Sequence, residues 1–557
     1  MSIGPPGVPP ALDPVGLGPA LARLGTEMVR HPLPALRHTT RLTTALATAA
    51  AQSTARGLGW KGDASLQPGP GDRRFADPAW QEHPWFLAQQ QAYLAVARYL
   101  RDVAGGAPSE PDAKADKAAV AVELLVDALA PTNTLWGNPA ALRAALQTRG
   151  ASVLEGFANL AEDLADNGGR PRQVDRSAFR VGEDLACTPG KVVYRNDLIE
   201  LLQYQPTTPD VYDVPLLLSP PWINRYYIMD LAPGRSFVEW AVAHGHTTFT
   251  ISYRNPGPDM GHLRLQDYLH DGLGHALDAV RDITGAPQVN VAGLCVGGTL
   301  AVMLLAWMAH DGPEQQPVRS LTLLNTLVDF SRPGRLGAFT DADAVARVER
   351  HMNETGVLDG QHMASTFDAL RPNDLIWNYV GTNWLMGQPP PAFDILAWNA
   401  DSTCIPAATH AEYLRSMYLE NRLARDELEI GGRRLEVGRV ATDVYVLAAK
   451  EDHITPWRSS YATTGLLGGD VRFVLSSSGH IAGIVNPPGP KRKHWLNDDV
   501  APSPEDWLAA ATEHGGSWWD DWAAWIGARA GGRRPPPAFG NDHYPVLGDA
   551  PGTYVHG

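Results

Sequence analysis

Short apolar runs alternate with helical segments along the larger part of this 557-residue chain. From Gly182 onward, strand-length runs rich in Val, Leu and Ile are separated by segments with the length and periodicity of helices. Such alternation predicts an α/β fold with a doubly wound, mostly parallel sheet. The predicted strands lie at residues 191–194, 198–202, 214–218, 247–252, 289–292, 321–324, 444–448 and 471–475.

The charge balance argues against nucleic acid as the main partner. The chain carries 46 Lys and Arg against 61 Asp and Glu, a net charge of -15, whereas nucleic-acid binding needs a basic surface. An anionic substrate must therefore be met by a local basic pocket.

We expect no transmembrane segment, because no apolar run approaches the required length of about 20 residues, and no signal peptide. The three scattered cysteines argue against a disulfide framework and indicate a reducing cytosol.

The most informative cysteine is Cys295. It lies in the sequence Gly-Leu-Cys-Val-Gly-Gly, between a predicted strand and an apolar helix. This is the context of the nucleophile elbow of α/β hydrolases, G-x-S-x-G, with Cys in place of Ser. The glycines on either side allow the strand and the helix to approach closely around a strained turn. The alternative is a buried cysteine in an ordinary glycine-rich turn.

An acid and a histidine follow Cys295 in the chain order that this fold uses. Asp452 comes just after the predicted strand at 444–448, and His480 comes after the next strand. The carboxyl ends of parallel strands share one edge of the sheet, where such sheets bind ligands. Glu451 is an alternative acid and His453 an alternative base. The other histidines lack grouped acidic or cysteine partners, so we expect no metal site.

Two backbone N–H groups are candidates for stabilising an oxyanion. One belongs to Val296, directly after the cysteine, at the start of the predicted helix. The other belongs to the loop at residues 219–227, which contains Asn224 and follows the strand at 214–218, where α/β hydrolases place a second donor. The alternative for this loop is ordinary turn chemistry with an aromatic packing cluster.

The strand–helix alternation stops between residues 328 and 440 and then resumes. The intervening segment is helical and rich in Trp and Met, so we predict an inserted lid, or cap, that excludes water from the site.

The N-terminal part of the chain is predicted to be helical. Residues 77–167 have helical periodicity, whereas residues 1–75 contain one or two weak amphipathic helices; the alternative for the latter is a helix that binds an apolar surface or a partner. We therefore predict five parts. Residues 1–75 form an N-terminal tail, flexible or weakly helical, and residues 76–180 form a helical N-terminal domain. Residues 181–327 form the first part of an α/β-hydrolase core, residues 328–440 the lid, and residues 441–557 the second part of the core with the C-terminal segment.

Several motifs in the same order resemble those of the polyhydroxyalkanoate synthases, which polymerise 3-hydroxyacyl-CoA. The Gly-x-Cys-x-Gly-Gly box is specific, because most relatives with this elbow carry Ser. The resemblance covers nearly the whole chain after residue 72. The matching motifs lie at residues 72–80, 221–230, 293–299, 370–377, 451–453, 478–483 and 516–519.

The resemblance implies Cys295 as the nucleophile, Asp452 as the acid and His480 as the base. It implies that the chain polymerises (R)-3-hydroxyacyl-CoA into polyhydroxyalkanoate with release of CoA. Residues 295–299 are similar to the class I enzymes, which use short-chain substrates such as 3-hydroxybutyryl-CoA. The implied partners are the growing polyester chain, the surface of a cytoplasmic polyester granule and a second copy of the chain. The resemblance implies neither a cofactor nor a metal.

Two other functions are compatible with the same pattern. In the first, water replaces the hydroxyl acceptor, and the chain is a thioesterase or depolymerase of the same fold. In the second, the chain is a non-catalytic protein of the granule surface. The exchange of Ser for Cys and the family motifs favour polymerisation, and the presence of all three triad residues argues against a non-catalytic role.

Overall fold

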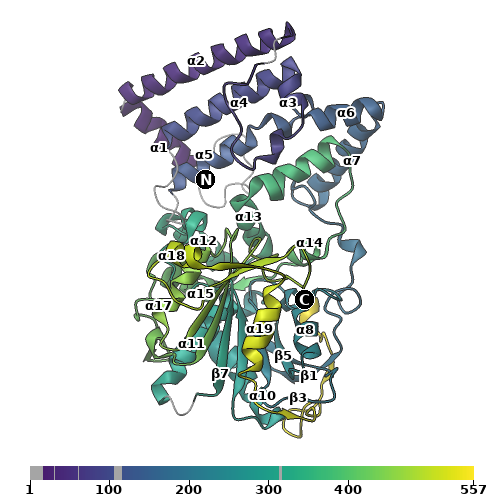
Figure 1. Ribbon diagram of the computed structural model, residues 1–557, viewed down its shortest axis with the longest axis vertical. Helices are drawn as coiled ribbons and strands as arrows, with labels where there is room; N and C mark the ends of the chain where they lie inside the picture. Colours follow the sequence, from purple (N-terminus) through teal and green to yellow (C-terminus); the bar gives the residue numbers. More distant parts are fainter. Residues whose placement is uncertain (1–16, 31, 60–61, 106–115, 313–315) are drawn as a thin grey trace. The chain divides into compact units, whose positions relative to one another are not determined.

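The computed structural model describes residues 17–30, 32–59, 62–105, 116–312 and 316–557, which form two compact units (Figure 1). The helical unit comprises the described residues up to 105, residues 116–175 and residues 365–392. The sheet unit comprises residues 176–364 and 393–557, apart from the undescribed positions 313–315. Among the described helices, none combines the length and the apolar character that a membrane crossing requires.

The helical unit is built around one apolar cluster. Phe75, Trp80, Phe86, Tyr93 and Val126 are buried in it. Figure 1 shows the long helix α2 lying beside α4. Helix starts follow from capping chemistry: α5 begins after Asp116, whose carboxylate accepts hydrogen bonds from two backbone N–H groups. The main helices of this unit are α1 (Leu17–Arg30), α2 (Pro32–Gly57), α4 (Pro84–Val103), α5 (Lys117–Ala128), α6 (Pro139–Gln147) and α7 (Ala151–Asp166).

Part of the predicted lid belongs to the helical unit. Residues 365–392 pack with its helices, and a Cβ atom at Gly156 of α7 would lie only 2.0 Å from the carbonyl oxygen of Trp384. Asn373 donates a hydrogen bond of 2.7 Å to Asp127, which also accepts one of 3.1 Å from Arg74. Two of the family motifs therefore meet at one buried carboxylate. The predicted insert at 328–440 is thus shared between the two units.

The sheet unit contains an eleven-stranded sheet in the order β15-β14-β13-β12-β7-β6-β4-β5-β2-β1-β17. The six central strands, from β13 to β5, are parallel, and the pairings outside them are antiparallel. This arrangement confirms the predicted doubly wound, mostly parallel sheet. The strands are β1 (Gly190–Arg195), β2 (Ile199–Tyr204), β4 (Leu216–Ser219), β5 (Thr248–Tyr253), β6 (Val289–Leu294), β7 (Val318–Leu324), β12 (Asp443–Ala449), β13 (Val471–Ser476), β14 (Lys493–Leu496), β15 (Thr512–Gly515) and β17 (Gly548–Asp549).

Helices cover this sheet and bury its apolar side chains. Nearly all residues of α11 (Val296–Met308) are buried, as expected for a helix of continuous apolar sequence in a large core. Helix α19 (Trp518–Gly527) packs with α8 (Phe237–Ala243), where the rings of Phe237 and Trp522 lie 4.6 Å apart (Figure 1). The indole N–H of Trp522 donates a hydrogen bond of 3.0 Å to the hydroxyl of Thr322 in β7. The C-terminal segment is therefore an integral part of the core.

Candidate active site

Cys295 lies on a strained turn between β6 and α11. Its φ of 52° and ψ of −122° are unusual for a residue other than glycine. The neighbouring glycines make the turn possible, because a Cβ at Gly293 would lie 2.4 Å from the Cα of Gly298. A Cβ at Gly297 would lie 2.1 Å from the carbonyl oxygen of Ser219. The strand–turn–helix context predicted for the Gly-x-Cys-x-Gly sequence is therefore present, and Cys295 is only 8% exposed.

The structure brings Asp452 and His480 together at the same edge of the sheet. Asp452 follows β12 and His480 follows β13, and these parallel strands end in register at Ala449 and Ser476. The carboxylate Oδ2 of Asp452 lies 2.6 Å from Nδ1 of His480, and both side chains are buried. This contact leaves Nε2 of the imidazole as the nitrogen for proton exchange with a nucleophile.

Asp452 is held in place by further hydrogen bonds. Its Oδ1 accepts from the backbone N–H groups of Ile454 and Thr455, at 2.8 and 2.9 Å. Its Oδ2 accepts from the hydroxyl of Thr455 at 2.6 Å. Burial alone would raise the pKa of Asp452, but the His480 ring and the hydrogen bonds from Thr455 hold it below its usual range. The carboxylate is therefore charged and fixed in orientation.

His480 interacts with both Asp452 and Cys295. Burial alone would lower the pKa of this histidine, but the Asp452 carboxylate, and then a hydrogen bond with the Cys295 side chain, raise it to about 10. A raised pKa favours the imidazolium form, so the thiol proton passes readily to His480 and the charged ring stabilises the resulting thiolate. Asp452 and His480 therefore have the contact that an orienting acid and a base require, and the Cys295 side chain influences the same imidazole.

Hydrogen bonds from neighbouring segments fix the backbone of His480 and of the loop that follows it. Asn325, directly after β7, donates a side-chain hydrogen bond of 2.5 Å to the carbonyl oxygen of His480. The loop after His480 is tied to α19, because Trp518 and Trp519 donate indole hydrogen bonds of 2.8 and 3.0 Å to the carbonyl oxygens of Gly483 and Ile484. The Gly-Ser-Trp-Trp motif of the sequence therefore supports the histidine loop.

The alternative acid, Glu451, and the alternative base, His453, do not occupy the positions of Asp452 and His480. Glu451 is exposed, and its backbone N–H donates to the carbonyl oxygen of Ser478, which ties the two loops together. His453 is half-buried beside Asp452. The histidine that contacts the Asp452 carboxylate is His480. The geometry thus favours Asp452 over Glu451 and His480 over His453.

The candidate oxyanion donors lie on two segments next to the cysteine. Val296 is the first residue of α11, so its N–H is among those that lack a partner within the helix ladder. Asn224 lies in the loop after β4, is half-buried, and forms an isolated bridge with Ser402. Its side-chain oxygen accepts a hydrogen bond of 2.7 Å from the backbone N–H of Arg225. The assignment of these two N–H groups to an oxyanion stays a prediction.

Two tyrosines that the sequence did not single out lie near the cysteine. Tyr413 and Tyr418 belong to the part of the insert that lies in the sheet unit, and their ring centroids are 5.8 Å apart. Burial is the main cause that raises the pKa of both phenols; the next is the neighbouring Tyr418 for Tyr413, and the Cys295 side chain for Tyr418. Phe330 makes edge contacts with both rings. Two aromatic side chains of the insert therefore lie near the cysteine.

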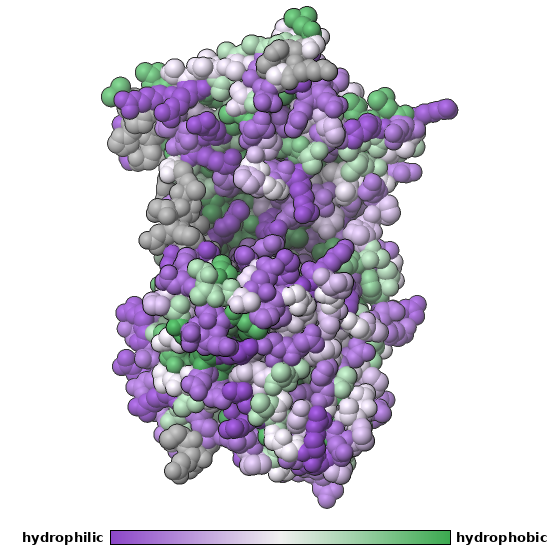
Figure 2. Space-filling view, in the orientation of Figure 1, coloured by the Kyte–Doolittle hydropathy of each residue, from purple (hydrophilic) through white to green (hydrophobic). Residues whose placement is uncertain are grey.

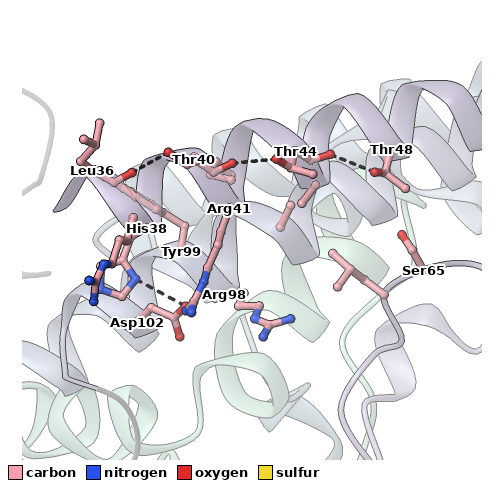
Figure 3. Close-up of a pocket in the computed structure, with 15 residues that line it drawn as sticks. Leu36, His38, Thr40, Arg41, Thr44, Thr48, Ser65, Arg98, Tyr99 and Asp102 are labelled. Carbon is pink, nitrogen blue, oxygen red and sulfur yellow. Dashed lines mark hydrogen bonds and ion pairs between the residues drawn. The ribbon is translucent and has the colours of Figure 1, made fainter. Parts of the chain in front are cut away.

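A separate pocket lies between α2 and α4 of the helical unit (Figure 3). Its volume is about 660 Å³, within the range of small-molecule sites. Arg37, Arg41 and Arg98 line it, together with His38, whose Nδ1 lies 3.7 Å from a carboxylate oxygen of Asp102. All lining residues belong to the helical unit, and none of them is a predicted site residue.

Comparison with known proteins decides the family. Residues 71–241 match the model described as Poly-beta-hydroxybutyrate polymerase (PhaC) N-terminus, and residues 233–487 match the alpha/beta hydrolase fold. The chain is 42% identical over 539 residues to a poly(3-hydroxyalkanoate) polymerase of Methylorubrum extorquens, covering 96% of this chain and 89% of that protein. The chain belongs to the poly(3-hydroxyalkanoate) polymerase family.

Other members of the family match over similar lengths. A poly(3-hydroxyalkanoate) polymerase 1 of Ectopseudomonas oleovorans is 43% identical, covering 89% of this chain and 88% of that protein. A poly(3-hydroxyalkanoate) polymerase subunit of Cupriavidus necator is also 43% identical, covering 87% of this chain and 83% of that protein. The predicted family resemblance and the α/β-hydrolase fold are therefore confirmed.

Proposed function

We propose that this chain polymerises (R)-3-hydroxyacyl-CoA into polyhydroxyalkanoate and releases CoA, through a covalent intermediate on Cys295. The observation that carries the proposal is the buried Cys295 on its strained turn, at the sheet edge where His480 contacts the buried carboxylate of Asp452. Membership of the polymerase family supports the choice of substrate.

In the first step, Nε2 of His480 accepts the proton of the Cys295 thiol, and the thiolate attacks the carbonyl carbon of the CoA thioester. The N–H of Val296, and a second N–H from the loop containing Asn224, stabilise the oxyanion. The bond to the CoA sulfur then breaks, and the proton on His480 passes to the departing thiolate. The product is an acyl-cysteine thioester, which is similar in energy to the substrate and remains reactive.

In the second step, the 3-hydroxyl of another acyl unit attacks the acyl-cysteine carbonyl. His480 accepts the hydroxyl proton, an ester bond forms, and the Cys295 thiolate leaves and recovers the proton. Asp452 orients the imidazole and stabilises its charged form throughout, because hydrogen bonds from Thr455 and Ile454 fix the carboxylate against Nδ1.

Water must be kept from the acyl-cysteine, because hydrolysis would end chain growth. Cys295 is buried; Tyr413 and Tyr418 of the insert lie near it, and Phe330 packs against both tyrosine rings. These side chains support the lid role for the part of the insert within the sheet unit. The burial of the thiol thus favours a hydroxyl acceptor carried by the substrate over free water.

The proposal extends to the partners of the enzyme. The substrate is a short-chain 3-hydroxyacyl-CoA, and the enzyme acts as a homodimer on cytoplasmic polyester granules. An apolar surface supports the granule contact: Leu154, Phe157 and Leu164 of α7 are 74%, 69% and 63% exposed on one face of the helix. Figure 2 shows apolar patches in green among polar residues on the visible face.

The proposal is tested by supplying 3-hydroxybutyryl-CoA and measuring CoA release and product in the same reaction. We expect CoA release together with polymer, and loss of both in Cys295→Ala. Free 3-hydroxy acid without polymer would identify a thioesterase-type hydrolase instead. No CoA release by the wild-type chain would support the non-catalytic alternative. The same assay with C4 and C8 substrates measures the chain-length preference.

A further inference from the structure

Three side chains with metal-binding donors lie together in the sheet unit, at the start of α13. His351 lies on α12 (Ala342–Thr355), and His362 lies in the first turn of α13 (Gly360–Leu370). Asp359 lies between them in the chain, after the short strand β8 (Val357–Leu358). One donor atom from each of the three residues lies within 4.8 Å of the other two.

The three side chains are already arranged around one point. Nδ1 of His362 lies 2.6 Å from Oδ2 of Asp359, and the backbone N–H of His362 donates a hydrogen bond of 3.0 Å to Oδ1. The imidazole rings of His351 and His362 have centroids 4.7 Å apart, with their planes inclined by 43°. Burial would raise the pKa of Asp359, but the hydrogen bonds from His362 lower it, so the carboxylate is charged at neutral pH.

His351 provides a second, independent indication of a missing ligand. Its Nε2 atom is buried and makes no hydrogen bond within the described part of the chain. A buried polar nitrogen without a partner is unfavourable, so native structures usually satisfy such groups with a protein atom, water or an ion. A bound ion next to the cluster would satisfy this nitrogen.

We propose that His351, Asp359 and His362 bind a divalent transition-metal ion of the Zn²⁺ type. Two imidazole nitrogens and one carboxylate oxygen form a ligand set that Zn²⁺ accepts, with bonds of about 2.0–2.2 Å and a fourth position left for water. In this proposal Nδ1 of His362 becomes a ligand: its proton moves to Nε2 of the same ring, and the hydrogen bond to Asp359 is replaced by two bonds to the ion. A small opening of the His362–Asp359 contact makes room for the ion.

The ion would connect the last turns of α12 to the first turn of α13 and thereby stabilise this part of the insert. The proposal is independent of the polymerisation chemistry, because none of the three residues belongs to the cysteine site. The sequence alone did not predict the site, because His351 and His362 are separated by the end of a helix, a turn and a short strand. Only the folded backbone brings the two rings together.

The test is calorimetric titration of the full chain with ZnCl₂ after treatment with a chelator. A Cys295→Ala background is measured in parallel, so that binding by the catalytic thiol is separated. We expect one Zn²⁺ per chain in this background and a higher melting temperature with Zn²⁺ than without it. We expect His351→Ala and His362→Ala each to weaken binding at least about tenfold.

Two further variants keep the test independent of folding defects. Asp359→Asn retains a side-chain oxygen to cap α13, and is expected to weaken Zn²⁺ binding while circular dichroism stays unchanged. His543→Ala is the matched control, because His543 also lies beside an aspartate, Asp282, at 3.1 Å, but belongs to no three-donor group among the described residues. Absence of Zn²⁺ binding, or binding that all three site variants leave unchanged, would overturn the proposal.

Discussion

Oδ2 of Asp452 lies 2.6 Å from Nδ1 of His480, and the hydroxyl of Thr455 lies within hydrogen-bonding distance of both. The carboxylate receives three hydrogen bonds from the loop after β12 and fixes the imidazole on the next loop. This relationship determines which nitrogen of His480 is available to Cys295. Separate substitutions can therefore test the carboxylate of Asp452, the hydroxyl of Thr455 that supports it, and the close backbone packing at the cysteine turn.

Asp452→Asn removes the charge of the carboxylate with little change of shape. The amide no longer stabilises the charged imidazole and can hold it in the wrong tautomer. We expect kcat for CoA release from 3-hydroxybutyryl-CoA to fall by about 10³-fold or more, with little change in KM. Glu451→Gln is the matched control, since Glu451 is exposed, and we expect less than about a threefold change. A larger loss in Glu451→Gln than in Asp452→Asn would reverse the assignment of the acid.

Thr455→Val removes the hydroxyl that supports Asp452 and retains the shape of the side chain. Without this hydrogen bond, the pKa of Asp452 rises and the His480 ring is less firmly held. We expect kcat to fall by about 3- to 30-fold, and the acid limb of the pH–kcat profile to move to higher pH. Thr455→Ser, which keeps the hydroxyl, restores most of the rate. If Thr455→Ser lost as much activity as Thr455→Val, the hydroxyl would not be the group that matters.

The Asp452–His480 pair contributes to stability within a defined pH range. The pKa of His480 is raised from 6.5 to about 10, so its contribution is complete below pH 6.5 and is lost as the pH rises toward 10. The pKa of Asp452 is lowered from 3.8, so its contribution is complete above pH 3.8 and is lost as the pH falls below it. The destabilisation caused by His480→Gln should therefore be greatest between pH 3.8 and pH 6.5.

Urea unfolding of the wild-type chain and of His480→Gln, at a series of pH values, measures this difference. The exposed residue His543 provides the control: His543→Gln should change the free energy of unfolding by less than about 0.5 kcal/mol throughout. A His480→Gln difference that stays constant up to pH 10 would contradict the raised pKa of His480.

Gly297→Ala tests the close packing around the cysteine turn. Its Cβ would lie 2.1 Å from the carbonyl oxygen of Ser219, which belongs to the neighbouring strand β4 and cannot move freely. We expect a loss of at least about 2 kcal/mol in the free energy of unfolding, together with loss of CoA release. Gly465→Ala in α17 (Thr463–Leu466) is the control, because no atom lies within 4 Å of its added Cβ. Equal melting temperatures for the two variants would contradict this account of the turn.

The parallel sheet could be predicted from the sequence because its strands are continuous apolar runs. Every residue of β6 and all but the first of β12 are buried, as the sequence pattern requires. The antiparallel edge strands β15 and β17 were not predicted, because they are short and exposed and carry no apolar alternation. Their pairing depends on neighbouring strands that are already folded.

The division of the insert could not be predicted from local pattern. Residues 365–392 join the helical unit through contacts with residues far away in the chain, such as the hydrogen bond from Asn373 to Asp127. Local periodicity contains no information about these contacts. The family motif at 370–377 indicated that the segment matters, but not which helices it packs against.

The chain order of Cys295, Asp452 and His480 could be predicted, because parallel strands deliver their following loops to one edge. The choice between Glu451 and Asp452 required the structure, since both follow the same strand. The turn that closes on Thr455 directs Asp452 inward. The position of Tyr413 and Tyr418 near Cys295 was not predicted, because both belong to an insert whose path through the fold the sequence does not reveal.

The account depends on an acyl group bound covalently to Cys295, and this bond can be measured directly. Butyryl-CoA lacks the 3-hydroxyl that extends the chain, so the acyl group should accumulate on the enzyme after CoA leaves. Proteolysis and mass spectrometry should then find the butyryl group on the peptide containing Cys295, as a thioester that hydroxylamine removes. CoA release with no acylated peptide, or with the acyl group on another residue, would contradict the central claim.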